Sequence, residues 1–179
     1  MNKSEIRNRI IKIRKNKSFK KTEINFQSIL KVLKKAKIKG KILGGYYPHN
    51  YEIDVIKTLY KFEKLNYFIS LPKIKKNYQM DFYNWSFKCP LSINRYGIPE
   101  PITNKIVFPD ILLVPLVAYD ANLNRIGYGG GFYDRYIKKI QKTKKILTIG
   151  LAYSFQKVQK ILVEKHDIKL DFIITDKEN

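Results

Sequence analysis

One segment, Pro109–Arg135, limits the possible folds of this chain more than any other. It opens with Ile111–Pro115, an apolar run without polar alternation, and continues into a loop with glycines at positions 127, 129, 130 and 131. The pattern over Phe132–Gln141 that follows the loop predicts a helix. An uninterrupted apolar strand is typical of a sheet that is covered on both faces. The order of strand, glycine loop and helix therefore predicts an α/β fold with a largely parallel sheet.

The rest of the chain continues this alternation of helices and strands. Thr22 is placed to cap one helix and Gly40 to stop it, while the prolines within Cys89–Lys105 predict a loop-rich segment. We expect helices over Lys3–Lys17, from Thr22 to about Lys37 and over Glu52–Glu63, and strands over Lys41–Tyr47, Tyr67–Leu71, Tyr78–Tyr83, Ile146–Tyr153 and Phe172–Thr175. Because no internal repeat or linker is visible, residues 1–179 are expected to form a single domain, a unit that usually has ~100–200 residues.

The glycine loop also carries the clearest chemistry in the sequence. Backbone N–H groups of such a loop, and of the helix after it, favour bound anions. Arg125, just before the loop, can bond to a phosphate, and Asp134, just after it, can hold Mg²⁺ against that phosphate. Neither a Walker loop nor a Rossmann fingerprint is present, because no Gly-Lys-Ser/Thr follows and the spacing differs from Gly-x-Gly-x-x-Gly. Glycines alone would equally fit a flexible turn between strand and helix.

The positive charge of the chain has two readings. The net charge is +21, and 36 − 6 = 30 of the basic residues are lysines. Lys, Ile, Asn and Tyr have AT-rich codons, so a solvated lysine coat can follow from genome composition alone. The other reading is a field that attracts anions such as nucleotides, nucleic acid or polycarboxylates. Residues 1–41 hold 15 basic and two acidic residues, a net of 15 − 2 = +13, so a non-catalytic basic module that binds nucleic acid stays open as the alternative function.

Several other classes of protein are excluded. The longest apolar run, Ile111–Tyr119, is far shorter than the ~20 residues of a membrane-spanning helix. Met1–Lys17 is charged throughout and does not fit a secretory signal, so we expect a cytoplasmic protein with no membrane partner. The single cysteine, Cys89, cannot form an internal disulfide, and together with two histidines it cannot build a Cys-rich zinc site.

The sequence around the glycine loop resembles a known family. The motif Arg-Ile-Gly-Tyr-Gly-Gly-Gly-Phe-Tyr-Asp-Arg at 125–135, after Pro-Asp-x₄-Pro-x₂-Ala-Tyr-Asp at 109–120, is similar to the signature of the 5-formyltetrahydrofolate cyclo-ligase family, also called methenyltetrahydrofolate synthetases. Shorter likenesses follow in the order of the family: Lys3-Ser-Glu-Ile-Arg7, Tyr47 to Glu52-Ile-Asp54, Met80-x-Phe82, Gly97-Ile-Pro-Glu-Pro101, Gly150-Leu-Ala-Tyr153, His166-Asp167 and Asp171-x-Ile-x-Thr175. The resemblance spans nearly the whole chain.

The resemblance implies both a fold and a reaction. The fold is a three-layer α/β/α domain, in agreement with the pattern of elements. The reaction uses ATP and Mg²⁺ to close 5-formyltetrahydrofolate, with or without a polyglutamyl tail, into 5,10-methenyltetrahydrofolate, and it releases ADP and phosphate. Such chemistry depends on positioning and charge stabilisation rather than on a protein nucleophile. A monomer that binds no nucleic acid is expected.

The resemblance also implies roles for individual residues, of which Arg125, Tyr128 and Asp134 would be catalytic. ATP would contact Lys3, Ser4, Glu5, Ile6 and Arg7 in the first helix, and Arg125, Ile126, Gly127, Tyr128, Gly129, Gly130, Gly131, Phe132 and Tyr133 in the loop. Folate would contact Tyr47, Glu52, Tyr128, Gly129, Gly130, Gly131 and Phe132. Mg²⁺ would be held by Asp134 and Asp167.

Structural alternatives exist for several of these residues. Lys3 and Arg7 can be surface charges, Glu52 can be an acid that favours a helix N-terminus, and Asp167 can be a turn residue. Tyr96 and Trp85 are weaker candidates for stacking on the folate rings, because aromatic residues more often pack in the core or at its rim.

Overall fold

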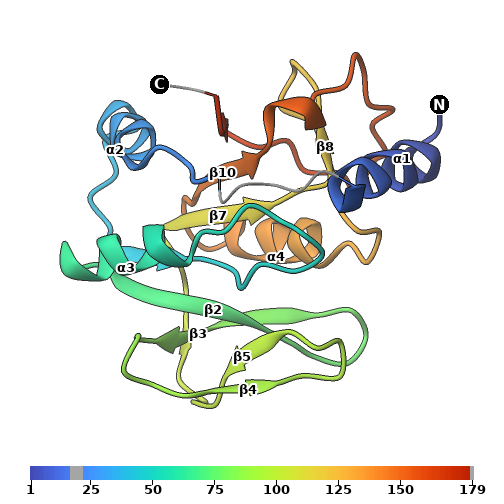
Figure 1. Ribbon diagram of the computed structural model, residues 1–179. Coiled ribbons are helices and arrows are strands. Elements are labelled where there is room, and N and C mark those ends of the chain that lie inside the picture. The colour runs from blue at the N-terminus through green and yellow to red at the C-terminus, as the bar shows by residue number, and fades with distance from the viewer. Residues whose placement is uncertain (17–21, 178–179) are drawn as a thin grey trace.

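The core of the structure is a sheet with helices on both of its faces (Figure 1). The computed structural model describes residues 1–16 and 22–177. Its seven strands are β1 (Ile42–Gly44), β2 (Phe68–Ile74), β3 (Met80–Trp85), β6 (Ile106–Val107), β7 (Ile111–Pro115), β10 (Leu147–Ala152) and β11 (Phe172–Thr175). They lie in the order β11-β10-β7-β1-β2-β3-β6. From β11 to β2 all neighbours are parallel, whereas β3 and β6 are antiparallel to theirs, so the predicted mainly parallel sheet is confirmed.

Strand β7 shows how the two faces are covered. Its side chains alternate: Ile111 and Leu113 join the apolar cluster beneath helices α2 (Phe26–Lys35) and α3 (Ile56–Lys64). Leu112 and Val114 join the opposite cluster, beneath helix α4 (Phe132–Gln141). All four side chains are fully buried, as the uninterrupted apolar run predicts. The expected three-layer α/β/α architecture is therefore confirmed.

Helix boundaries differ from the predicted ones where a different side chain provides the cap. Helix α2 begins at Phe26 because the Asn25 side chain accepts a hydrogen bond from the N–H of Gln27 at 2.9 Å, so the predicted cap at Thr22 is wrong. Helix α3 begins at Ile56 rather than at Glu52, since the preceding turn is closed by Asp54, which accepts from the N–H of Ile56. The first helix, α1, spans Lys3–Asn16, and the predicted end at residue 17 lies outside the described residues.

Proline-containing segments differ most from the predictions. Strand β2 continues through Pro72, where a strand end was expected, because its pairing with β1 already ends at Ser70 and the missing N–H is tolerated as at a sheet edge. The stretch predicted as loop contains a hairpin of β4 (Leu91–Ile93) and β5 (Pro99–Pro101). Both of its prolines belong to a two-stranded sheet, which consists of edges only, so neither must donate to a second neighbour.

Helix α1 is brought to the carboxyl ends of the strands by a third apolar cluster. Ile6 and Ile10 pack there against a small hairpin of β8 (Ala118–Tyr119) and β9 (Arg125–Ile126), and Ile161 completes the cluster. Figure 1 shows α1 beside β8, far from α2 and α3. A short 3₁₀ turn, η1 (Ser154–Gln156), follows β10. None of the helices within residues 1–16 and 22–177 is long and apolar enough to cross a membrane.

Gly44 is predicted to be a packing requirement of the central strand β1. A Cβ atom at this position would lie 2.8 Å from Cδ1 of Leu112 and 2.9 Å from Cε1 of Phe82, well inside van der Waals contact. Gly44→Ala should therefore lower the free energy of unfolding by about 1–3 kcal/mol, the usual cost of overpacking. Chemical denaturation measures the change. Gly127→Ala is the control, because its nearest neighbour would be Nη1 of Arg125 at 3.5 Å, and equal midpoints for the two variants would contradict this packing.

Candidate functional site

The neighbouring strands β1 and β7 form a point where the chain diverges. From β1 the chain continues to β2 on one side, and from β7 the next strand of the sheet, β10, lies on the other side. In an open parallel sheet such a divergence leaves a crevice outside the carboxyl ends of the strands, where ligands bind. A cavity of about 680 Å³ lies there, and its wall includes Tyr46 and Tyr47, which follow β1, and Pro115, which ends β7.

Six further segments complete the wall of this cavity. They are the turn 49–52, the first turns of α1, the ends of β2 and β3 with the turn between them, the β4–β5 hairpin, the loop 125–134 and residues 164–167. The predicted site residues that line it are Lys3, Ser4, Arg7, Tyr47, Glu52, Arg125, Ile126, Gly127, Tyr128, Gly129, Gly130, Gly131, Phe132, Tyr133, Asp134 and Asp167. The fold thus gathers residues from both ends of the chain at one crevice.

Of the four other candidates, three lie outside the cavity wall and one lines it. Glu5 and Ile6, predicted to contact ATP, lie outside the cavity wall, because the Glu5 side chain accepts from the N–H of Asn2 and Ile6 packs in the third apolar cluster. Trp85 is also outside, since its ring is buried in the core and its Nε1 donates to the Cys89 carbonyl. Tyr96 does line the cavity, and 44% of its surface is exposed.

The glycine loop is fixed by backbone geometry and by two arginines. Gly129 has a φ of 99° and Gly131, the N-cap of α4, has a φ of 63°, conformations that side chains with a Cβ rarely adopt. From one side, Nε of Arg7 donates to the Gly127 carbonyl at 2.8 Å. From the other side, Arg135 donates to the carbonyls of Gly130 and Tyr78. The loop therefore presents its amides and the start of α4 to the cavity in a fixed shape.

Arg125 and Asp134 form a partly buried ion pair at the loop. Nη2 of Arg125 lies 2.8 Å from Oδ1 of Asp134, which also accepts from the N–H of Ile168 at 3.2 Å. The Arg125 side chain is only 4% exposed, and its Nε has no hydrogen-bond partner among the described residues. Arg125, which is predicted to bind phosphate, is thus paired with Asp134, which is predicted to bind Mg²⁺.

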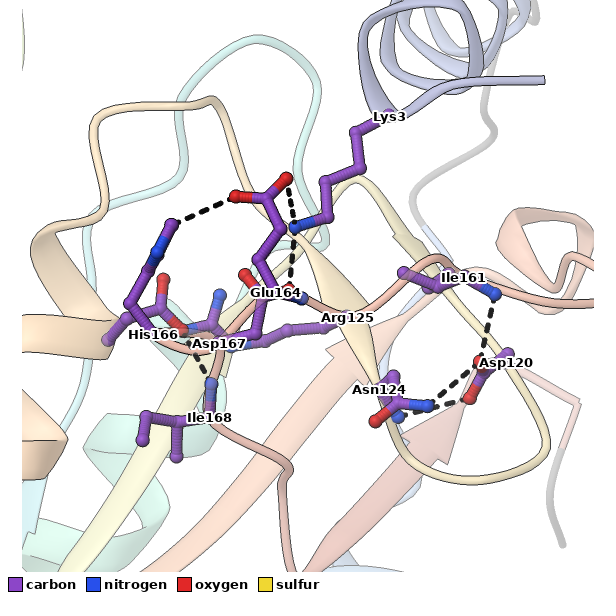
Figure 2. Close-up of polar contacts among 10 residues, drawn as sticks. Lys3, Asp120, Asn124, Arg125, Ile161, Glu164, His166, Asp167 and Ile168 are labelled. Carbon is purple, nitrogen blue, oxygen red and sulfur yellow. Dashed lines mark hydrogen bonds and ion pairs between the residues drawn. The ribbon is translucent and has the colours of Figure 1, made fainter.

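A second cation of the site, Lys3, is also paired with carboxylates. Nζ of Lys3 lies 2.6 Å from Oδ2 of Asp167 and 2.9 Å from Oε1 of Glu164, and Figure 2 shows it between the two carboxylates. Burial by itself lowers the pKa of Lys3, but the hydrogen bonds and charges of these two acids outweigh it and raise that pKa. For Asp167, burial by itself raises the pKa. The hydrogen bond from the N–H of Glu164 and the contact with Lys3 outweigh burial and lower that pKa. Both groups are therefore charged near neutral pH.

Asp120 holds the hairpin from which Arg125 extends. Its carboxylate accepts hydrogen bonds from Asn124, from the N–H of Asn122 and, across the structure, from the N–H of Ile161 (Figure 2). Burial raises the pKa of Asp120, but these donors outweigh burial and lower it. The carboxylate therefore stays ionised and ties the β8–β9 turn to the segment that leads to Asp167.

The opposite wall of the cavity carries a buried carboxylate, Glu52. Burial raises its pKa to about 7, although the N–H of His49, the charge of Arg14 and the Tyr128 hydroxyl each lower it. His49 donates that N–H to Oε2 of Glu52 at 2.9 Å. Burial also raises the pKa of Tyr133 well above its usual range, so this neighbour is neutral. Glu52 consequently exchanges its proton near neutral pH.

Arg14, the largest fully buried side chain of the described residues, is not among the predicted site residues. Its guanidinium lies behind the cavity wall and donates to the carbonyl of Leu116 and to the hydroxyl of Tyr128. One signal could have identified it. Arg14 follows Arg7 by seven residues and Ile10 by four, and both spacings place residues on the same side of a helix.

The donor set near the loop fits Mg²⁺ with phosphate but not a metal held by protein alone. Among the described residues, no three His, Cys, Asp or Glu side chains lie close enough to hold an ion. Oδ2 of Asp134 and Oδ1 of Asp167 accept no hydrogen bond within that part of the chain. One or two carboxylates completed by substrate phosphates is the usual environment of Mg²⁺.

The chain is similar to known proteins in sequence and in structure. A 5-formyltetrahydrofolate cyclo-ligase of Haemophilus influenzae is 34% identical over 178 residues, which cover 93% of each chain. One from Mycoplasma pneumoniae is 33% identical and covers 76% of this chain and 73% of that protein. The solved 5,10-methenyltetrahydrofolate synthetase of Mycoplasma pneumoniae matches with a TM-score of 0.75 and 26% identity, over 99% of this chain and all of that one.

A second solved structure and a family model complete the comparison. The 5,10-methenyltetrahydrofolate synthetase of Aquifex aeolicus matches with a TM-score of 0.77 and 30% identity, over 99% of this chain and 91% of that one. The family model matches residues 1–176, which include every segment of the cavity wall. The chain therefore belongs to the 5-formyltetrahydrofolate cyclo-ligase family.

Proposed function

We propose that this enzyme uses ATP and Mg²⁺ to convert 5-formyltetrahydrofolate into 5,10-methenyltetrahydrofolate, with release of ADP and phosphate. The observation that carries the proposal is one cavity with two different walls. One wall offers loop amides and cations suited to a triphosphate, and the other offers a buried carboxylate with aromatic neighbours suited to a pterin. We further propose that the enzyme acts as a cytoplasmic monomer and accepts folates with or without a polyglutamyl tail.

The proposed reaction has two steps. The formyl oxygen of the folate attacks the γ-phosphorus of ATP and ADP leaves, which turns that oxygen into a phosphate leaving group. The neighbouring folate nitrogen then attacks the activated carbon and loses its proton, and phosphate leaves with the oxygen. Neither step needs a protein nucleophile, so the work of the residues is to align the two substrates and to stabilise charge on the phosphoryl group.

On the nucleotide side, we assign Lys3, Arg7 and Arg125 and the loop amides to the phosphates. Asp134 and Asp167 would hold Mg²⁺, which supplies charge neutralisation of the phosphates when it is bound. In the structure these carboxylates are paired with Arg125 and Lys3. On binding of the nucleotide with its metal, Lys3 and Arg125 would exchange these carboxylates for phosphates, and the carboxylates would be left to hold the metal.

On the folate side, we assign Glu52 to the N–H edge of the pterin and Tyr47, Tyr128 and Phe132 to its surroundings. A carboxylate matches two neighbouring N–H groups, and its buried position excludes competing water.

The direct test of the whole proposal mixes the purified chain with Mg-ATP and 5-formyltetrahydrofolate. ADP and the methenyl product should form in equal amounts, and the product is followed by its near-ultraviolet absorbance. ATP hydrolysis at a rate that does not depend on the folate would contradict the proposal.

Arg125→Ala should impair phosphoryl transfer. A hydrogen bond to a charged group contributes about 1.5–3 kcal/mol, so kcat/KM should fall roughly tenfold to a hundredfold or more. Steady-state kinetics measure the loss, and circular dichroism checks that the variant is folded. Turnover close to wild type in a folded variant would remove Arg125 from the mechanism.

Asp134→Asn and Asp167→Asn should each raise the Mg²⁺ concentration needed for half-maximal activity, because one carboxylate ligand is weakened in each. Both serve one ion in the proposal, so the double variant should lose less free energy than the sum of the single losses. Titrations of rate against Mg²⁺ provide the values, and folate binding without metal should stay largely intact. If Asp167→Asn leaves the Mg²⁺ dependence unchanged, the metal site consists of Asp134 and the nucleotide alone.

Glu52→Gln should stabilise the fold while it weakens folate binding. The pKa of Glu52 is higher in the folded chain than its ordinary 4.5. The contribution of Glu52 to the stability of the fold is therefore fully present below pH 4.5 and is lost as the pH rises through about 7. At about pH 8 the ionised side chain costs roughly 3 kcal/mol, since each pKa unit corresponds to ~1.4 kcal/mol. Thermal unfolding should show a higher Tm for Glu52→Gln than for wild type at alkaline pH and equal values near pH 4.

The same titration predicts how folate affinity depends on pH. If the ionised Glu52 binds the pterin, the affinity of the wild type should weaken as pH falls below about 7, by up to tenfold per unit. Calorimetry with 5-formyltetrahydrofolate measures this dependence, and Glu52→Gln should bind weakly with a flat profile. A wild-type affinity that does not change between about pH 5 and 8 would show that Glu52 does not bind folate as an anion.

A further inference from the structure

The guanidinium of Arg14 connects three segments that are distant in sequence. It lies in the last turn of α1, is 1% exposed, and donates to the Leu116 carbonyl at 2.6 Å, the Tyr128 hydroxyl at 2.7 Å and the Asn50 carbonyl at 3.3 Å. Leu116 follows β7, Asn50 belongs to the turn after β1, and Tyr128 belongs to the glycine loop. All three segments border the cavity, but Arg14 itself is not part of its wall.

The charge of Arg14 is not matched by a bonded carboxylate. All its acceptors are carbonyls or a hydroxyl, and its Nε has no partner among the described residues. Burial of a guanidinium without an ion pair is unfavourable, so this side chain is a poor choice for stability alone. The acid that feels its charge is Glu52, whose pKa it lowers.

The hydrogen bond from Arg14 also fixes the direction of the Tyr128 hydroxyl. Arginine can only donate, so Oη of Tyr128 accepts from Arg14 and directs its own proton to the acceptors on the other side. These are the His49 carbonyl, 3.3 Å away, and the Glu52 carboxylate, whose pKa this hydroxyl lowers. The N–H of the same His49 donates to Glu52. The contacts thus run without interruption from α1 through Tyr128 and the turn 49–52 to the carboxylate in the cavity.

We propose that Arg14 is a positioning residue for the folate half of the site, which sets Tyr128 and the turn that carries Glu52 without touching the ligand. The proposal rests on the proposed function, because that function assigns Tyr128 and Glu52 to folate. It divides α1 into two parts. Lys3 and Arg7, in its first turns, serve the nucleotide, and Arg14, at its end, serves the folate.

The test compares Arg14→Met with Arg9→Met. Both substitutions remove one positive charge from α1, but Arg9 is exposed and has no role in the site. Arg14→Met should raise the KM for 5-formyltetrahydrofolate roughly tenfold or more, as expected for loss of a hydrogen bond to a charged group, and change the KM for ATP less than about twofold. Arg9→Met should change neither. Arg14→Lys keeps the charge without the planar fork, so it should recover only part of the folate affinity.

A double-mutant cycle with Tyr128→Phe tests the connection itself. If Arg14 acts through the hydroxyl, the combined rise in folate KM should be clearly smaller than the product of the single rises, whereas independent effects would multiply and overturn the proposal. Should Arg14→Met fail to fold, the same cycle is measured with Arg14→Lys, and the same two outcomes decide.

Failure of this proposal is distinguishable from failure of the proposed function. A wild-type chain that forms no methenyl product from 5-formyltetrahydrofolate and ATP overturns the proposed function. An active wild type, with Arg14→Met leaving the folate KM unchanged or raising both KM values equally, overturns the role of Arg14 alone, because an equal rise is the sign of general structural damage.

Discussion

The parallel pairing of β1 with β7 is the constraint on which the rest of the structure depends. Leu43 pairs with Ile111 and Gly44 with Leu112, so the two chain directions are locked side by side at the centre of the sheet. Because the chain leaves these strands toward opposite sides, their carboxyl ends have no connection running across them. The turn that carries Glu52 follows β1, the hairpin and the glycine loop follow β7, and α1 packs against that hairpin.

Charge complementarity within the site is the second organising feature. In the proposed function this cavity would receive several phosphate charges and would need cations, yet unpaired cations close together would repel each other and destabilise the fold. The ion pairs of Arg125 with Asp134, and of Lys3 with Asp167 and Glu164, would satisfy both demands, since each cation has a carboxylate that a metal ion could bind in its place. Arg14 and Glu52 are also opposite charges, but they are not in direct contact: Arg14 bonds to the Tyr128 hydroxyl, and both lower the pKa of Glu52.

The parts of the fold that could be predicted from sequence are those with a local signal. Ile111–Pro115 and Phe132–Gln141 have the bounds that their apolar patterns indicate, since burial on both faces or on one stripe leaves a periodicity. The Pro99–Pro101 strand has no such pattern, because its pairing is set by a partner across a hairpin. In the site, the loop motif was visible, whereas Arg14 was not, since its acceptors are mainly backbone carbonyls from segments that only the tertiary fold brings together.

The bridge between Lys3 and Asp167 has a consequence for how the chain acquires its shape. The two residues are 164 positions apart, and Arg7 reaches across 120 positions to the glycine loop. During synthesis α1 is made before both of the groups that it binds. Contacts between such distant positions carry a high loop-closure entropy and form late. We therefore expect the cavity to be complete only once the glycine loop and the segment around Asp167 have formed and α1 has docked onto them.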